Sequence, residues 1–222
     1  MIVTFANQKG GVGKTTLCML FANYLVKKNY NVLVLDVDRQ RSIIAQRKSD
    51  ASAFTDQDEE YNIEECDIEN VENARLMIEQ AKKIDGIILL DTPGNVTEDG
   101  LIPIFQNSDV IICPYQYERR CLESTGVFIQ VIEKLKSMFS DMKPTLFYVP
   151  NSIDTRIGTK DEIELWTETD KIFRKFGHVT PRVAYKSSLM RANTYSLSVA
   201  QEEEVKQCFD FIIEVMKNNK LN

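Results

Sequence analysis

The chain has 222 residues, of which 43 % are hydrophobic and 27 % are charged, as is ordinary for a soluble globular protein. This length predicts a single domain, residues 1–222, with a sizeable core. The net charge of −6 and an isoelectric point near 5.0 argue against a protein that is basic over its whole surface and binds nucleic acid there. The apolar runs are too short to cross a bilayer.

Cysteine usage points to a reducing compartment. The five cysteines lie far apart, with no spacing typical of a metal site, and the chain has one histidine. An odd number of cysteines without a pairing pattern predicts free thiols and a cytoplasmic location. The chain opens on an apolar run with no basic region before it, so we expect no secretory signal.

The first segment carries the most informative motif. The apolar run 2–6 predicts a buried strand, and residues 15–28 have helical spacing. The glycine-rich segment Lys9–Thr16 lies between them, and a strand, a glycine-rich loop and a helix in this order are typical of a P-loop. Backbone N–H groups of such a loop and the helix N-terminus bind phosphate. We expect the phosphates to contact Gly10, Gly11, Val12, Gly13, Lys14, Thr15 and Thr16.

Within the P-loop, two side chains have further expected roles. Lys14 reaches the outer phosphates, and the Thr15 hydroxyl binds Mg²⁺.

The next strand, residues 31–36, ends in an acidic motif, Asp36-Val37-Asp38-Arg39-Gln40. Beyond it, residues 50–72 are rich in Asp and Glu and have no Lys or Arg, which predicts a solvated connection because like charges resist packing. Without this segment the remaining chain is slightly basic, so a local basic face is compatible with the composition. A helix is expected near residues 75–83.

A third strand, residues 86–91, ends at Asp91 after four apolar residues. This is the Walker B arrangement, in which the carboxylate holds Mg²⁺, often through water. Asp91 is followed by Thr92-Pro93-Gly94, and the turn formed by Pro93, Gly94 and Asn95 is expected near the terminal phosphate of the nucleotide.

The rest of the chain continues the alternation of strand and helix. Strands are expected at 109–113 and 145–149, and helices near 122–138, 161–176 and 200–217. Continuous apolar strands alternating with helices predict an α/β fold with a mostly parallel, twisted sheet and helices on both faces. Ligands of such sheets bind at the carboxyl ends of the strands, where the P-loop, Asp36, Asp91 and Asn151 all fall.

The P-loop departs from the standard spacing. Position 8, where glycine is usual, holds Gln8, and a second lysine, Lys9, precedes Gly10. This resembles the deviant Walker A motif of the ParA/MinD superfamily. The resemblance implies a homodimer that holds two ATP molecules, with Lys9 crossing the interface to the partner's nucleotide. A lysine there has a physical logic, because it offsets the self-repulsion of a polyphosphate shared between subunits.

The same resemblance implies roles for other residues. Asp38 orients and deprotonates the attacking water, and Asp36 lies in the second shell of Mg²⁺, although Arg39 stands where the family commonly has proline. Asn151 pairs with the adenine edge, and the segment 180–182, including Pro181, packs beside the base.

The short chain is similar to the small ParA proteins of plasmids and mobile elements. That likeness implies a partition ATPase of the cytoplasm and nucleoid, which binds DNA nonspecifically when ATP-bound and is stimulated by a centromere-binding, ParB-like adaptor. The expected DNA-contacting cations are Arg182, Lys186, Arg191 and Lys206.

Three alternatives remain open on sequence: a MinD-like membrane ATPase, an accessory ATPase of conjugative transfer, and a metabolic ligase related to dethiobiotin synthetase. The apolar residues of the last helix favour core packing over membrane attachment.

Overall fold

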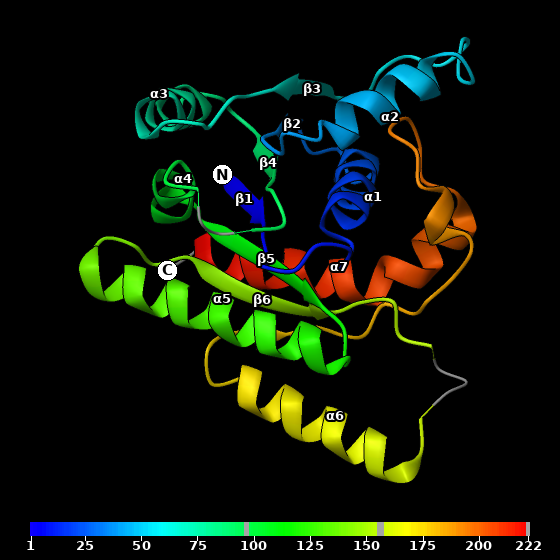
Figure 1. Ribbon diagram of the computed structural model, residues 1–222. Coiled ribbons are helices and arrows are strands. Elements are labelled where there is room, and N and C mark those ends of the chain that lie inside the picture. The colour runs from blue at the N-terminus through cyan, green and yellow to red at the C-terminus, as the bar shows by residue number, and fades with distance from the viewer. Residues whose placement is uncertain (96–97, 155–157, 221–222) are drawn as a thin grey trace.

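The computed structural model describes residues 1–95, 98–154 and 158–220. Within these residues, seven parallel strands form one sheet in the order β3-β2-β4-β1-β5-β6-β7, with helices on both faces (Figure 1). The expected α/β fold with a parallel sheet is therefore confirmed. The strands are β1 (Ile2–Phe5), β2 (Val32–Asp36), β3 (Asn62–Glu65), β4 (Ile87–Asp91), β5 (Val110–Tyr115), β6 (Thr145–Pro150) and β7 (His178–Val179).

The helices divide into two layers. α1 and α7 cover one face of the sheet together with part of α2, while α3, α4 and α5 cover the other (Figure 1). The central strands β1, β4 and β5 are buried along their whole length, as expected for apolar strands with helices on both sides. The helices are α1 (Lys14–Lys27), α2 (Ser42–Ala51), α3 (Val71–Ala81), α4 (Leu101–Asn107), α5 (Arg119–Met138), α6 (Lys160–Phe173) and α7 (Val199–Lys220).

The register of the sheet brings the acidic strand ends together. Asp91 at the end of β4 is paired with Phe5 of β1 on one side and with Asp36 of β2 on the other. Because β1 leads directly into the glycine-rich loop, both carboxylates lie beside that loop. The topology thus assembles one polar cluster from three strand ends, as expected for a parallel sheet.

The prediction of a solvated connection at residues 50–72 was wrong in part. The segment contains β3, and Asp50 at its start is 6 % exposed and accepts hydrogen bonds from the backbone N–H and hydroxyl of Thr194, at 2.7 and 2.8 Å. β3 is an edge strand whose side chains are mostly exposed, so it lacks the apolar run that revealed the other strands. α2, α4 and β7 were not anticipated either.

The last helix, α7, packs on α1 as core. Its apolar side chains Val205, Cys208, Phe209 and Ile212 are fully buried, which confirms the expectation of core packing. Phe209 contacts the rings of Phe21 and Tyr24 edge to face. In the part of the chain that the structure describes, no helix is both long and apolar enough to span a membrane.

Candidate nucleotide-binding site

The glycine-rich loop connects β1 to α1 and is fixed at its start by Asn7. The buried Asn7 side chain donates to the carbonyl of Pro114, at 2.7 Å, and to the hydroxyl of Thr125, at 3.0 Å. Its own carbonyl accepts the N–H of Lys9, at 3.2 Å. Sequence reasoning missed Asn7, because one asparagine after a strand matches no motif. It ties the loop to β5 and α5 and so sets where the loop begins.

Two glycines let the loop turn into the helix. Gly11 and Gly13 have positive φ angles of 76° and 95°, a region that side chains with a Cβ rarely adopt. α1 begins directly after Gly13, so its free N–H groups and the positive end of its dipole face the loop. This is the geometry expected of an anion site.

Lys14 is directed inward along the loop. It is only 7 % exposed, and its Nζ donates to the carbonyl of Lys9 at 3.3 Å. Burial lowers the pKa of Lys14, while the carboxylates of Asp91 and Asp38 act in the opposite direction. A polyphosphate ligand would stabilise the charged form of this buried ammonium group, because it would bring further negative charge close to it.

Asp91 and Thr15 meet across the loop. The Thr15 hydroxyl donates to Asp91 Oδ2 at 2.7 Å, and Asp91 is fully buried. Burial raises the pKa of Asp91 to about 7, helped by the neighbouring Asp36, while the Thr15 hydrogen bond and Lys14 act against this rise. The pKa of Asp36 is also raised by burial, although the N–H groups of Ile43 and Ile44 hold its Oδ2 and oppose the shift.

The residues at this point fit a divalent cation. The Oδ1 atoms of Asp91 and Asp36 are buried and have no hydrogen-bond partner among the described residues. Carboxylate and hydroxyl oxygens suit Mg²⁺, which keeps several waters and uses few protein ligands. Thr15 would bind the ion, with Asp91 and Asp36 holding its waters, and the ion would neutralise charge on the phosphates. Among the described residues, no group of three or more His, Cys, Asp and Glu is placed to hold a metal ion.

The segment after β2 holds the expected catalytic aspartate. Asp38 is partly exposed, and its Oδ1 accepts the N–H of Gln40 at 2.9 Å. Arg39, which departs from the family pattern, lies 3.7 Å from a carboxylate oxygen of Glu69 and 3.7 Å from one of Glu98. The role of Asp38 in positioning water stays a prediction.

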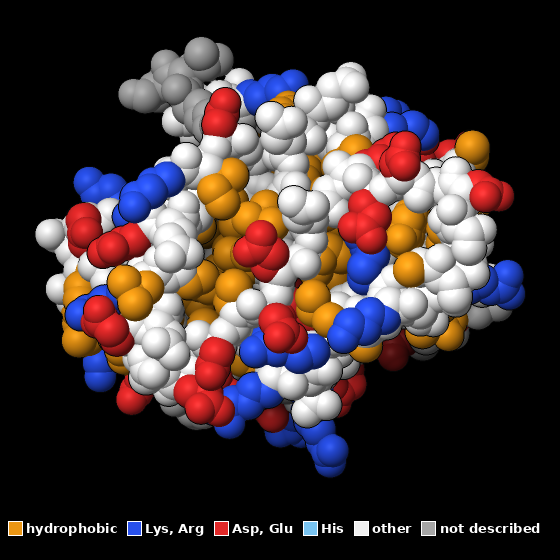
Figure 2. All heavy atoms as spheres, turned by 90° about the horizontal axis from the view of Figure 1, so that it is seen from above, with side chains coloured by type: hydrophobic (Ala, Val, Ile, Leu, Met, Phe, Trp, Pro, Cys, Tyr) orange, Lys and Arg blue, Asp and Glu red, His pale blue; other side chains and the backbone are white. Residues whose placement is uncertain are grey.

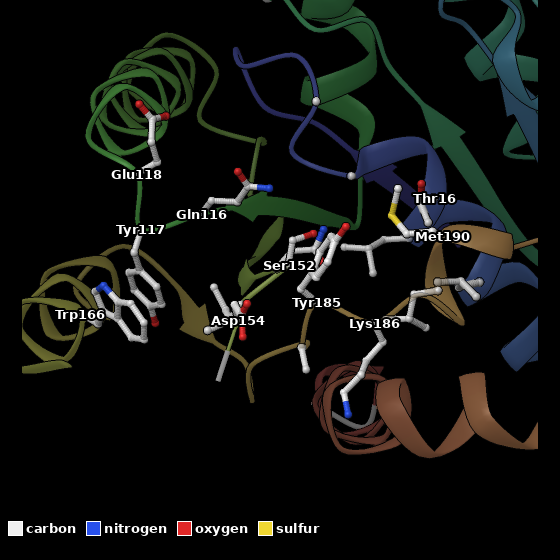
Figure 3. A pocket seen from close by; sticks show the side chains of 18 of the residues that line it. Thr16, Gln116, Tyr117, Glu118, Ser152, Asp154, Trp166, Tyr185, Lys186 and Met190 are labelled. Carbon is white, nitrogen blue, oxygen red and sulfur yellow. The ribbon is translucent and has the colours of Figure 1, made fainter. Parts of the chain in front are cut away.

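A cavity of about 550 Å³ extends from the loop toward α6 (Figure 3). Its lining includes Gly11, Gly13 and Thr16 at the loop, and Tyr117 and Trp166, whose rings stack at 4.8 Å, at the far end. The volume lies within the range of small-molecule sites, and the cavity adjoins the glycine-rich loop.

Asn151 lines this cavity but also braces the loop. It is 6 % exposed, and its Nδ2 donates to the carbonyl of Val12 at 2.8 Å, which leaves its Oδ1 as the acceptor toward a ligand. Pro181 is not among the cavity's lining residues; Ala184, Tyr185 and Lys186 from the same segment are. The adenine roles of Asn151 and Pro181 stay predictions. Tyr185, Leu189 and Met190 were missed because they belong to no motif.

Three of the four expected DNA-contacting cations face carboxylates. Arg182 lies 3.3 Å from Asp170, Lys186 lies 3.0 Å from Glu204, and Lys206 lies 2.9 Å from Asp210. Arg191 ends a short 3₁₀ helix, Leu189–Arg191, and is exposed. On the face shown in Figure 2, Lys and Arg side chains are scattered among Asp and Glu. The DNA-binding role of these four residues stays a prediction.

Comparisons with known proteins find relatives of this chain by sequence. A ParA family protein of Mycoplasma genitalium is 24 % identical over 206 residues, which cover 73 % of this chain and 75 % of that protein. An uncharacterized protein of Methanocaldococcus jannaschii is 48 % identical over 40 residues, but the match spans only 18 % of this chain and 15 % of that protein.

Solved structures that share the fold include two with a bound nucleotide analogue. A plasmid partition protein of Borrelia burgdorferi bound to AMPPNP has a TM-score of 0.73 at 19 % identity, covering 96 % of this chain and 98 % of that one. Cobyrinic acid a,c-diamide synthase of Mycobacterium smegmatis, with a bound ATP analogue and magnesium, has a TM-score of 0.74 at 16 % identity, covering 98 % and 96 %. Residues 3–195 match the CobQ/CobB/MinD/ParA nucleotide-binding domain, and the chain belongs to this family.

Proposed function

We propose that this protein is a Mg²⁺-dependent ATPase with slow intrinsic hydrolysis that forms a homodimer around two ATP molecules. It acts in the partition of plasmid or other mobile-element DNA, and an adaptor protein bound to that DNA stimulates hydrolysis. The similar Borrelia burgdorferi structure, a plasmid partition protein bound to AMPPNP, supports this choice within the family.

The observation that carries the proposal is the pair of lysines in one loop. Lys14 is buried and directed along the loop, where it serves the nucleotide of its own subunit. Lys9 is partly exposed, and no carboxylate in the described ranges forms an ion pair with its ammonium group. A second cation at the rim of the site is suited to a polyphosphate held by a second subunit.

In this function the residues of the site have two separate roles, phosphate binding and the positioning of water. The loop N–H groups and Lys14 bind the phosphates, and Asp38 positions a water molecule for attack on the terminal phosphate. Hydrolysis of this kind depends on positioning and charge stabilisation more than on a strong base.

The test is ATP binding and hydrolysis by purified protein and by Lys14→Ala, with and without EDTA. The native protein should bind ATP and hydrolyse it slowly, and EDTA should stop hydrolysis. Lys14→Ala should weaken ATP binding by about 100-fold or more, because it loses hydrogen bonds to charged groups worth ~1.5–3 kcal/mol each. Equal ATP affinity in a Lys14→Ala protein of native thermal stability would refute the site.

A further inference from the structure

We infer that Tyr185 stacks on the base of the bound nucleotide and supplies most of the affinity that the base contributes. This inference rests on the proposed nucleotide site and names a residue that determines how the site holds its ligand.

Tyr185 is a large aromatic residue exposed within a cavity. Its side chain is 53 % exposed, and it lines the same cavity as the loop glycines. Figure 3 shows it in the middle of that cavity, between Thr16 and Met190 on one side and Tyr117 and Trp166 on the other. Among the described residues, no aromatic ring stacks on it, whereas Tyr117 and Trp166 already stack on each other.

The backbone fixes the position of Tyr185. Residues 183–185 run beside the end of β6 and the residues after it, joined by three hydrogen bonds. Val183 N–H donates to Pro150 at 2.8 Å, Ile153 N–H donates to Val183 at 3.1 Å, and Tyr185 N–H donates to Ile153 at 2.9 Å. The ring is therefore presented from an extension of the sheet and not from an unsupported loop.

The cations of the segment that carries Tyr185 are paired with carboxylates, while Glu118, Asp154 and Glu162 also line the cavity. Lys186 pairs with Glu204 of α7, and Arg182 pairs with Asp170 of α6. Apolar side chains also line this cavity, namely Leu17, Leu20, Leu189 and Met190. A flat ring with apolar faces is the ligand group that suits this combination, and phosphates on the loop place a nucleobase in the cavity.

Stacking of this kind has a recognisable chemical signature. An aromatic side chain binds the π-face that every base has, so its contribution depends little on which base is present. Tyr185 should therefore act alike on ATP and GTP, and it should make no difference to a polyphosphate that has no base.

The experiment compares ATP with inorganic tripolyphosphate by calorimetric titration. Tyr185→Ala and Tyr185→Leu, the second of which keeps apolar volume but has no aromatic face, should both weaken ATP binding by about 5- to 100-fold, as for one lost base–aromatic stack. Binding of tripolyphosphate should change less than twofold, and Tyr185→Phe should keep native affinity for ATP. Leu165→Ala, at a residue 59 % exposed on α6 and outside the cavity lining, is the matched control.

Two results overturn the inference and are distinguishable from failure of the site itself. ATP affinity within twofold of native in both Tyr185→Ala and Tyr185→Leu removes Tyr185 from base binding, while the proposed function stands. Parallel losses of ATP and tripolyphosphate binding also overturn it, because they indicate a distorted loop. A native protein that binds neither compound refutes the proposed function together with this inference.

Discussion

At Gly13 the glycine-rich loop leaves no room for a side chain. A Cβ there would lie 2.2 Å from Nδ2 of Asn151, and the φ of 95° is strained for any residue that carries one. Asn151 cannot easily move aside, because it is buried and donates to Val12. The side chain of Asn151 therefore packs directly against the loop at Gly13, and a larger residue at position 13 would displace it.

Gly13→Ala should lower the thermal stability of the protein, with a cost on the order of 1–3 kcal/mol for the forced backbone conformation alone. Gly10→Ala is the control, since no heavy atom lies within 4 Å of a Cβ there and its φ is not positive. Asn151→Ala alone should also lower stability, because Val12 loses a hydrogen bond. The Gly13→Ala change should cost less in the Asn151→Ala background than in the native protein, because the collision is absent there while the φ strain remains. Melting curves of the native protein and the four variants measure this, and equal stability of Gly13→Ala and Gly10→Ala would contradict the account.

At the scale of elements, one tyrosine–aspartate contact fastens α7 to α1. The hydroxyl of Tyr24, a fully buried residue, donates to Asp210 at 2.6 Å, and Lys28 and Lys206 bind the same carboxylate. Burial opposes ionisation of Asp210, but these three hydrogen bonds outweigh it and lower the pKa of Asp210 from its ordinary 3.8 to about 2.

Asp210→Ala should destabilise the protein by about 1 kcal/mol, because the Tyr24 hydroxyl loses its acceptor. For a chain of this size that corresponds to a fall in Tm of about 2–4 °C. Glu203→Ala, at an exposed residue of the same helix, should change Tm much less. Because the pKa of Asp210 is depressed in the folded protein, its carboxylate stabilises the fold fully above about pH 4, and this stabilisation is lost as the pH falls toward 2. The difference between native and variant should therefore shrink over that interval, and a difference independent of pH would contradict the role of the charge.

The strands differ in how well the sequence pattern predicts them. β1, β2, β4, β5 and β6 were predictable because strands buried on both faces are apolar without interruption. β3 escaped prediction because an edge strand pairs on one side and exposes acidic side chains. The glycine-rich loop between β1 and α1 was predictable because its spacing is itself the signal, and its contacts to phosphate stay a prediction.

The cavity wall could not be predicted in this way. Tyr185 and Met190 reach the cavity through tertiary packing, which leaves no local signature in the sequence. Asp36 was predictable only in part. Its position at the end of a strand was predicted, but it also accepts hydrogen bonds from the N–H groups of Ile43 and Ile44, and the helix that contains them, α2, was not predicted.

For the whole molecule, the charge distribution constrains any binding to DNA. The chain has a net charge of −6, and Arg182, Lys186 and Lys206 are partly neutralised by carboxylates. One subunit therefore offers few cations to a phosphate backbone, and we expect binding only when two subunits combine theirs.

Binding of the ATP-loaded Asp38→Ala protein to unrelated duplexes should thus require ATP and show little sequence preference. Its log K should fall with log salt by about 0.9 for each phosphate contact that is neutralised. Titrations at several salt concentrations measure the slope. Lack of ATP-dependent binding even at low salt would contradict a role in DNA partition and favour the membrane or metabolic branches of the family.

The central claim is that two ATP molecules and two copies of Lys9 close a dimer. Sedimentation velocity with ATP and Mg²⁺ tests it most directly on two variants. Asp38→Ala should sediment as a stable dimer, because ATP binds and water is no longer positioned for hydrolysis. Lys9→Ala should bind ATP with native affinity yet remain monomeric, because the cation that crosses the interface is gone. A monomeric Asp38→Ala together with a dimeric Lys9→Ala would contradict the account.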